Sequence, residues 1–147
     1  MTPTNTDKQE VSKMVTFMSY NSTGINTVKC NWINEICDNY DVNYLAIQEH
    51  FKSTKTTDKF FRDNFKEFNS YVIPGHRSPG QDSGRAKAGL AQLSLKALAI
   101  RKDRVLTRGF RIQAQVLLLN DKKILWITTY LPTDPQTVEV FDAAALN

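Results

Sequence analysis

Two short apolar runs with a helical pattern between them constrain the fold of this 147-residue chain more than any other feature. Val15–Tyr20 and Val42–Gln48 are rich in β-favouring residues, and turn residues follow the first run. Between them, apolar residues recur at helical spacing and predict one buried helix face: Val28, Trp32, Ile33, Ile36 and Tyr40. The order strand, helix, strand predicts two parallel strands joined by a crossover helix.

The rest of the chain predicts one more central helix and several strands. The helix covers Asp58–Phe65, with three inward side chains: Phe60, Phe61 and Phe65. The predicted strands are Ser70–Ile73, Leu90–Ile100, Phe110–Leu119 and Lys123–Tyr130, the last two joined by the turn NDKK at 120–123. Residues 76–89, rich in Gly, Ser and charge, predict an exposed loop. Outside these elements, we expect a mobile polar leader at 1–13 and a terminal helix at Thr137–Leu146.

Polar side chains follow three of the predicted strands at their carboxyl ends. Asn21 follows the first strand, Glu49 the second, and Tyr130 ends the last. If these ends share one edge of an α/β fold, they form a site, because such sheets bind ligands there. Amide and carboxylate oxygens suit Mg²⁺ or Mn²⁺, and a Tyr hydroxyl can bond a phosphate oxygen. The pattern therefore points to metal-assisted phosphoester chemistry; an ordinary solvated strand end is the alternative.

Charge and cysteine content narrow the class of protein. The net charge is +4, which is compatible with a polyanionic partner and equally with a plain solvated surface. Cys30 and Cys37 stand too far apart in a regular helix to form a disulfide, so we expect structural thiols in a reduced, intracellular protein. No apolar stretch approaches the length of a membrane span, and the polar leader does not resemble a secretory signal.

Four segments in order resemble the endonuclease/exonuclease/phosphatase family, and most of all the endonuclease domain of LINE-type, non-LTR retrotransposons. They are VTFMSYNSTG at 15–24, YLAIQEH at 44–50, AGLAQLSL at 88–95 and ILWITTYLPTD at 124–134. The resemblance implies a four-layer α/β sandwich in which two packed sheets carry helices on their outer faces. It also implies a Mg²⁺- or Mn²⁺-dependent enzyme that nicks DNA during target-primed retrotransposition.

The same resemblance implies a role for each motif residue. Glu49 would be the metal ligand, Asn21 would assist at the metal and the phosphate, and Tyr130 would contact the scissile phosphate. Gln48 would support Glu49 by a hydrogen bond. Thr133 stands where many relatives carry Asn, which puts a side-chain ligand there in doubt. His50 is expected to be a rim residue that supports the loop of Glu49.

The later motifs of that family are absent from the sequence. There is no Gly-Asp-x-Asn, which supplies the Asp that activates water, and no Ser-Asp-His, which supplies the His that holds the phosphate. We therefore expect residues 14–147 to be the N-terminal portion of such a domain, incomplete and inactive by itself. Two alternatives stay open: a non-catalytic copy that at most binds DNA or a divalent ion, and a phosphoesterase of the same superfamily acting on another substrate.

The remaining expectations concern DNA and the core. Arg77, Arg85 and Lys87 lie in the basic region 76–111 and are candidates for contact with the DNA backbone. His76 opens the loop and is expected to be solvated. Trp32 and Trp126 are expected in the core. A DNA target implies a nuclear location, and the family implies a reverse transcriptase elsewhere in the full-length protein; the oligomeric state is not predicted.

Overall fold

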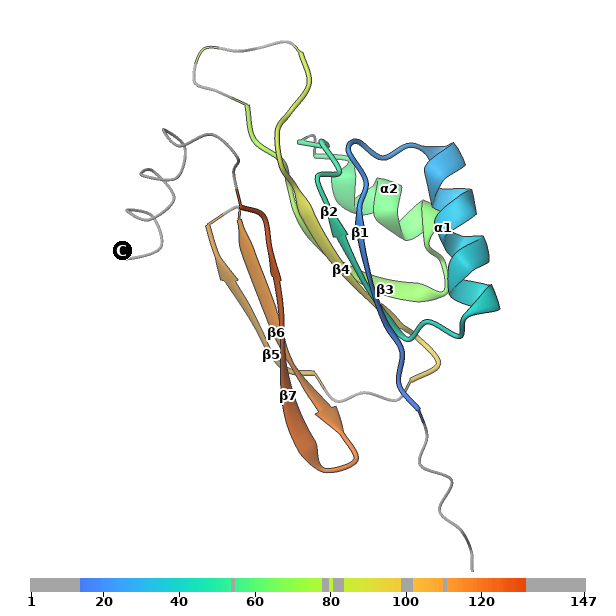
Figure 1. Ribbon diagram of the computed structural model, residues 1–147. Helices are drawn as coiled ribbons and strands as arrows, with labels where there is room; N and C mark the ends of the chain where they lie inside the picture. Colours follow the sequence, from blue (N-terminus) through green and yellow to red (C-terminus); the bar gives the residue numbers. More distant parts are fainter. Residues whose placement is uncertain are drawn as a thin grey trace, which may run out of the picture.

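A computed structural model describes residues 14–53, 55–77, 80, 84–98, 102–109 and 111–131, with the backbone alone for 102–108. The elements follow one another along the chain as shown in Figure 1. They are β1 (Phe17–Asn21), α1 (Thr27–Asn39), β2 (Tyr44–Gln48), α2 (Thr57–Asn64), β3 (Phe68–Ile73), β4 (Leu90–Leu95), β5 (Lys102–Arg108), β6 (Ile112–Leu119) and β7 (Lys122–Thr129). The leader at 1–13 and the helix predicted at 137–146 lie outside the described residues. Within them, no helix has the length and apolar content needed to span a bilayer.

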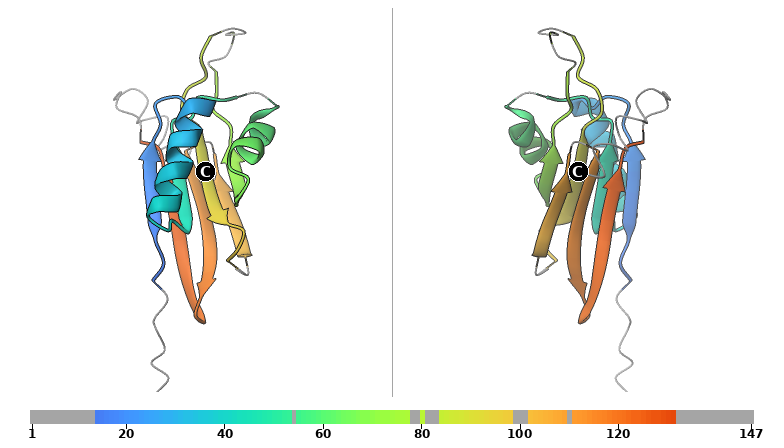
Figure 2. Two further views of the ribbon diagram at one scale, coloured as in Figure 1. Left: turned by 90° about the vertical axis from the view of Figure 1, so that its right-hand side faces the viewer. Right: turned by 90° about the vertical axis from the view of Figure 1, so that its left-hand side faces the viewer.

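The first sheet has the strand order β1-β2-β4-β3. β1 and β2 pair in parallel, with Phe17 opposite Tyr44 and Asn21 opposite Gln48, so the predicted crossover through α1 is confirmed. β4 then runs antiparallel between β2 and β3. Both helices cover one face of this sheet, and the second sheet lies on the other (Figures 1 and 2).

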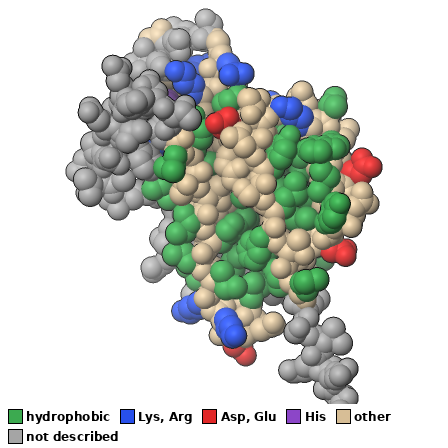
Figure 3. All heavy atoms as spheres, in the orientation of Figure 1, with side chains coloured by type: hydrophobic (Ala, Val, Ile, Leu, Met, Phe, Trp, Pro, Cys, Tyr) green, Lys and Arg blue, Asp and Glu red, His purple; other side chains and the backbone are tan. Residues whose placement is uncertain are grey.

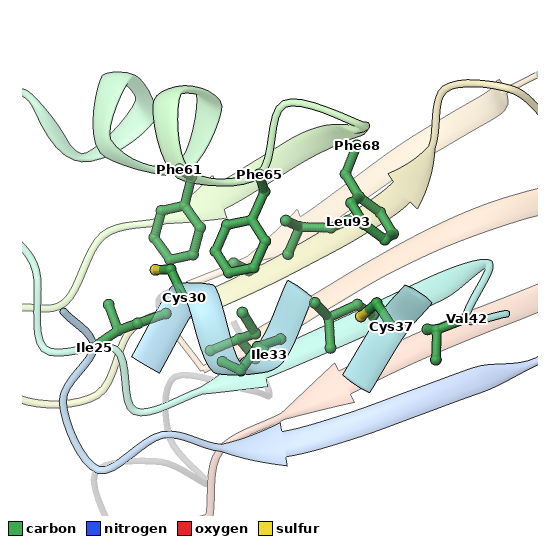
Figure 4. Packing of buried hydrophobic residues seen from close by; sticks show 12 residues of the cluster. Ile25, Cys30, Ile33, Cys37, Val42, Phe61, Phe65, Phe68 and Leu93 are labelled. Carbon is green, nitrogen blue, oxygen red and sulfur yellow. The ribbon is translucent and has the colours of Figure 1, made fainter. Parts of the chain in front are cut away.

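The hydrophobic core lies between the helices and the four-stranded sheet (Figure 4). The helix face predicted for α1 is partly wrong: Val28, Trp32 and Tyr40 are exposed, Trp32 by 49%. The residues that face the sheet are Cys30, Ile33 and Cys37, spaced by three and four. Both thiols are free, and burial raises their pKa to about 11, which agrees with structural thiols.

Helix α2 contributes a phenylalanine cluster to this core. Phe61 and Phe65 are fully buried and stacked at 6.0 Å between ring centroids, while Phe60 is half-buried against them. The prediction for these three residues is therefore confirmed. His50 packs edge-on against Phe61 at 5.2 Å between centroids, so the helix also supports the turn that follows β2.

The second sheet has the order β5-β6-β7 and is antiparallel throughout. The predicted hairpin is confirmed, because Leu119 pairs with Lys122 and leaves a two-residue loop. Asn120 and Asp121 both have positive φ, 47° and 62°, as a type I′ turn requires. Strand β5 was not predicted, and the strand predicted over 90–100 ends at Leu95.

The two sheets pack face to face through aromatic and amide side chains. Trp126 of β7 lies edge-on against Phe17 and Tyr44, at 5.8 and 5.4 Å between centroids. It is half-buried rather than fully in the core. The buried amide of Gln92 donates across the interface to Thr128 Oγ1 at 2.9 Å, and Gln113 Nε2 donates back to the carbonyl of Tyr71 at 2.8 Å. The described residues thus form three layers: helices, sheet and sheet.

Apolar side chains remain on the outer face of the three-stranded sheet. Leu125 is 56% exposed and Ile127 is 53% exposed, and both alternate along β7 with residues that face the other sheet. Val116 of β6 pairs with Leu125 and is half-buried. An apolar patch on a sheet face is typical of a surface that packs against something else.

Candidate active site at the ends of β1, β2 and β7

The parallel pairing of β1 and β2 brings Asn21 and Glu49 to adjacent strand ends. Asn21 is the last residue of β1 and lies opposite Gln48, the last residue of β2. Beyond the strand ends, the two segments of the chain stay hydrogen-bonded: Ser22 N donates to Gln48 O at 2.8 Å, and Gly24 N donates to Glu49 O at 2.7 Å. The predicted proximity of the Asn and the Glu therefore follows from the register of one strand pair.

Asn21 is held in place by the turn that follows it. Its Oδ1 accepts hydrogen bonds from the backbone N of Thr23 at 3.1 Å and from Thr23 Oγ1 at 3.3 Å. Thr23 has a φ of 44°, a left-handed conformation that brings both donors toward the amide. Asn21 is exposed, and these two bonds fix the orientation of its amide.

Glu49 and Phe51 both have positive φ, 56° and 58°, on either side of His50. Such backbone is costly for residues with a side chain and persists where surrounding contacts enforce it. Here Ser22 Oγ donates to Glu49 O at 3.0 Å, and Phe51 N donates to Ala88 O at 3.0 Å. The chain is thus turned sharply at the strand end, and Glu49 stays half-exposed there.

His50 is buried beneath this turn rather than placed at the rim, so the prediction of a rim residue is wrong. It is only 1% exposed. Nδ1 accepts from Lys52 N at 3.0 Å, and Nε2 donates to Ile73 O at 3.0 Å, which fixes the neutral tautomer. Burial lowers the pKa of His50 to about 4, with a smaller contribution from Lys52. The ring therefore supports Glu49's loop as a neutral, structural group.

Tyr130 reaches the same end of the molecule on the second sheet. β7 runs in the direction of β1 and β2: Trp126 lies against Phe17 and Tyr44 at the strand starts, and Thr128, two residues on, is bonded to Gln92, which lies opposite Ala46 further along β2 (Figure 1). Tyr130 follows the last residue of β7, and its N donates to Arg111 O at 3.0 Å. All three predicted residues therefore lie at one end of the packed sheets, Asn21 and Glu49 on adjacent strands and Tyr130 across the interface.

Gln48 lies between the two sheets rather than bonded to Glu49. Its Nε2 donates to Ser19 Oγ at 2.9 Å, so within the described residues it links β2 to β1. It also lines a hollow of about 360 Å³ together with Ser19, Thr128 and Thr129. The hollow is lined by the first half of β1, by β2 and by the second half of β7. Thr133 lies outside the described residues.

The basic candidates occupy two places. Arg77 and Arg85 line one hollow beside Phe51, whereas Lys87 forms a backbone bridge with His76, with N–O distances of 3.0 and 2.8 Å. His76 is half-buried rather than solvated, and burial followed by the nearby Arg111 lowers its pKa. The pairing of 76 with 87 shows that the predicted exposed loop is closed at its base.

The fold has a counterpart among solved structures. The chain resembles the AP endonuclease LMAP from Leishmania major, with a TM-score of 0.64 and 14% sequence identity. The match covers 89% of this chain and 46% of the other, so the chain spans about half the length of that protein. It shows an AP-endonuclease-like fold. The sequence matches no model of a known protein family and no curated protein.

The donor set at these strand ends fits a hard cation only in part. Asn21 and Glu49 offer oxygen ligands, and Mg²⁺ commonly takes one or two protein carboxylates and completes its shell with water and phosphate. No cluster of three or more His, Cys, Asp or Glu side chains able to hold a metal occurs in the described part of the chain. Arg111 was considered in the sequence only as part of the basic region 76–111; its buried guanidinium lies 5.7 Å from the ring centre of Tyr130. The sequence around Arg111 contains no motif that distinguishes it from the other basic residues of this region.

Proposed function

We propose that this chain forms part of a metal-dependent endonuclease that hydrolyses DNA phosphodiesters. The observation that carries the proposal is the arrival of Asn21, Glu49 and Tyr130 at one end of two packed sheets, on three separate strands. An amide, an acid and a phenol suit a hard cation beside a phosphate. The AP-endonuclease-like fold supports the same class of reaction.

Each residue has a stated part in this proposal. Glu49, with Asn21, would hold a Mg²⁺ or Mn²⁺ ion, and Tyr130 would donate to an oxygen of the scissile phosphate. When bound, the ion would stabilise negative charge on the phosphate. His50 would fix the position of Glu49 from below, and Gln48 would hold the end of β2 against β1 through Ser19. Thr133 remains a candidate neighbour of Tyr130 from the sequence.

The finer assignment rests on the strand-end motifs. Because they resemble the endonuclease domain of LINE-type retrotransposons, we propose nicking for target-primed retrotransposition, a nuclear location and a reverse transcriptase in the full-length protein. The four-layer sandwich belongs to the same proposal. Its fourth layer would cover the apolar outer face of β6 and β7, where Leu125 and Ile127 are exposed.

A second candidate function is a non-catalytic copy that binds DNA or a divalent ion. Two observations favour it: the sequence lacks Gly-Asp-x-Asn and Ser-Asp-His, and the described residues hold no larger cluster of metal ligands. Without a group that activates water, binding and cleavage are separable. The other alternative, a phosphoesterase of the same superfamily, differs from the proposed endonuclease only in its substrate.

Nicking of supercoiled plasmid by the full-length protein tests these candidates, because this chain is expected to be inactive by itself. We expect Mg²⁺- or Mn²⁺-dependent nicking that EDTA abolishes, and a loss of at least about 100-fold in Glu49→Gln, since the ligand charge is removed. Glu35→Gln, on the exposed side of α1, is the matched control and should keep full activity. Activity of Glu49→Gln within a few-fold of the parent would refute the role of Glu49.

Two further arms separate the alternatives. Binding of DNA or Mn²⁺ without any nicking would favour the non-catalytic copy. Release of phosphate from a phosphomonoester, by the same preparation and without plasmid nicking, would favour the other phosphoesterase. The Glu49→Gln variant should lose that activity as well if the same site performs it.

A further inference from the structure

A second hollow, of about 220 Å³, opens beside the candidate active site. It begins directly after the turn of Glu49 and His50, since Phe51, Lys52 and Ser53 line it. The start of α2 and the segments around Arg77 and Arg85 complete it. Chain segments separated by more than twenty residues thus contribute basic groups to one concave surface.

Two of these cations are positioned by aromatic rings. The guanidinium of Arg85 lies 4.1 Å from the ring centre of Phe51, and Lys52 Nζ lies 4.1 Å from the ring centre of Phe60. Cation–π contact of this kind holds a charge without neutralising it. Arg85 and Lys52 therefore keep their full charge for a further partner while losing part of their side-chain freedom.

The segment of Phe51 and Lys52 is held in position by other parts of the chain. Phe51 Cδ2 lies so near Gly24 that an added Cβ there would be 3.1 Å away. Phe51 N is bonded to Ala88 O, and Lys52 O accepts from Gly75 N at 2.8 Å. The floor of the hollow is thus tied to three other parts of the chain, and its shape is set in advance of any ligand.

The charge of the hollow is of one sign. Its described lining holds three cations, Lys52, Arg77 and Arg85, hydroxyls from Ser53, Thr56 and Thr57, and no carboxylate. Lys and Arg side chains also gather at this end of the molecule in Figure 3. Three cations and three hydroxyls around a small concavity match the oxygens of a phosphate group. Because Phe51 and Phe60 each already carry a cation over the ring, we do not include stacking of a DNA base on these rings in the match.

We infer that this hollow binds a backbone phosphate of duplex DNA, next to the phosphate that the candidate active site would receive. The inference rests on the proposed function for the choice of DNA over other phosphate carriers. It adds Lys52 to the contacts and separates Arg77 and Arg85 from Lys87, which lies outside the hollow. The contact is independent of base sequence, because it involves the backbone alone.

Equilibrium binding of a labelled 20-base-pair duplex, measured by fluorescence anisotropy in EDTA, tests the inference without any cleavage. The variant Arg77→Gln/Arg85→Gln removes two charges from exposed side chains. We expect at least a tenfold loss of affinity at about 50 mM salt, and a salt slope shallower by about 0.9, since the hollow holds one phosphate and each lost phosphate contact contributes about 0.9. The matched control is Lys122→Gln/Lys123→Gln, which removes two exposed charges at the hairpin on the far end; it should bind within about twofold of the parent.

The outcomes separate this inference from the proposed function. If the parent nicks plasmid but the hollow variant binds DNA as the parent does, the inference fails and the proposed function stands. If the hollow variant alone loses affinity while no nicking occurs, the inference stands and catalysis fails. Equal losses in both double variants would mean only general charge attraction and would overturn the inference. The inference would also be overturned if the hollow variant bound duplex DNA as the parent does but lost binding to phosphatidylserine vesicles or to inorganic phosphate.

Discussion

The imidazole of His50 occupies the space in which a side chain at position 89 would lie. A Cβ built on Gly89 would be 2.6 Å from both Nδ1 and Nε2 of the ring. The ring cannot move away easily, because it is bonded to Lys52 N and Ile73 O and packed on Phe61. The glycine that leads β4 is thus required by the histidine that follows Glu49.

Substitution at Gly89 should therefore disrupt the turn that carries Glu49. Gly89→Ala combines a φ of 98° with a clash against a buried ring, and we expect a loss of about 2–4 kcal/mol in unfolding free energy. Gly84→Ala is the control, since Gly84 has the same φ of 98° but nothing within 4 Å. It should lose only about 1 kcal/mol. Urea unfolding of both variants measures the difference, and equal losses would show that the backbone alone is responsible.

The buried His50 should also make stability depend on pH. Its pKa is near 4 in the folded chain against 6.5 for an ordinary histidine, so between these values the unfolded chain binds the extra proton. Stability is therefore complete above pH 6.5 and falls as the pH drops toward 4. A shift of this size corresponds to about 3 kcal/mol. Unfolding free energies measured from pH 7.5 to 4.5 should show a loss of that order.

Replacement of the ring isolates this contribution. His50→Gln should be less stable than the parent at pH 7.5 but lose less on acidification, so the two curves converge toward pH 4.5. His76→Gln serves as comparison, because burial and then the charges of Arg111 and Lys87 lower the pKa of His76 as well. If His50→Gln keeps the full pH dependence of the parent, the acid sensitivity arises elsewhere.

Local periodicity and strand-end motifs were enough to predict the central architecture. The strand–helix–strand unit, the hairpin with its NDKK turn and the inward phenylalanines of α2 were predicted from spacing alone, since each depends on near neighbours in sequence. Strand β5 was missed because KDRVLTR has no clear alternation. It is a strand through its pairing with β6, a contact that periodicity does not reveal.

Each error in the predicted burial of side chains has a physical cause. Trp32 was placed in the core because it is large and apolar, yet it lies at the margin, edge-on to Tyr20 at 5.6 Å between centroids. The small thiols of Cys30 and Cys37 fit where helix and sheet approach closely. His50 was expected at the rim because it follows the end of a strand, next to Glu49. Its burial depends on Gly89, which is distant in sequence, so no local pattern indicates it.

Gln92 should stabilise the packing of the two sheets against each other. Its Nε2 lies 2.9 Å from Thr128 Oγ1, 3.2 Å from Trp126 O and 3.3 Å from Gln113 O, all on the second sheet. Gln92→Leu should cost about 1–3 kcal/mol, because a buried donor shared among three acceptors is lost. A double-mutant cycle with Thr128→Val should give a coupling of about 0.5–1.5 kcal/mol. Additive losses would mean that these two side chains do not interact in solution.

The apolar outer face of β7 should cause the 147-residue chain to self-associate. Leu125 and Ile127 are more than half exposed, and Leu125 lies beside Val116, which is half-buried on the neighbouring strand. An exposed sheet face of this kind buries apolar area when two copies meet. Sedimentation velocity at increasing concentration should show species larger than a monomer. A parent chain that stays monodisperse and monomeric, and melts cooperatively, would contradict this expectation.

The variant Leu125→Thr/Ile127→Thr should suppress this association while the fold is kept. Threonine retains the strand preference of a β-branched residue but removes most of the apolar area, so the midpoint of thermal unfolding should change little. Leu117→Thr is the contrasting variant, because Leu117 is fully buried and its loss should cost about 2 kcal/mol or more. If the double variant self-associates as strongly as the parent, the outer face is not the surface through which the copies meet, and the exposed apolar residues of α1, Val28 and Trp32, become the next surface to test.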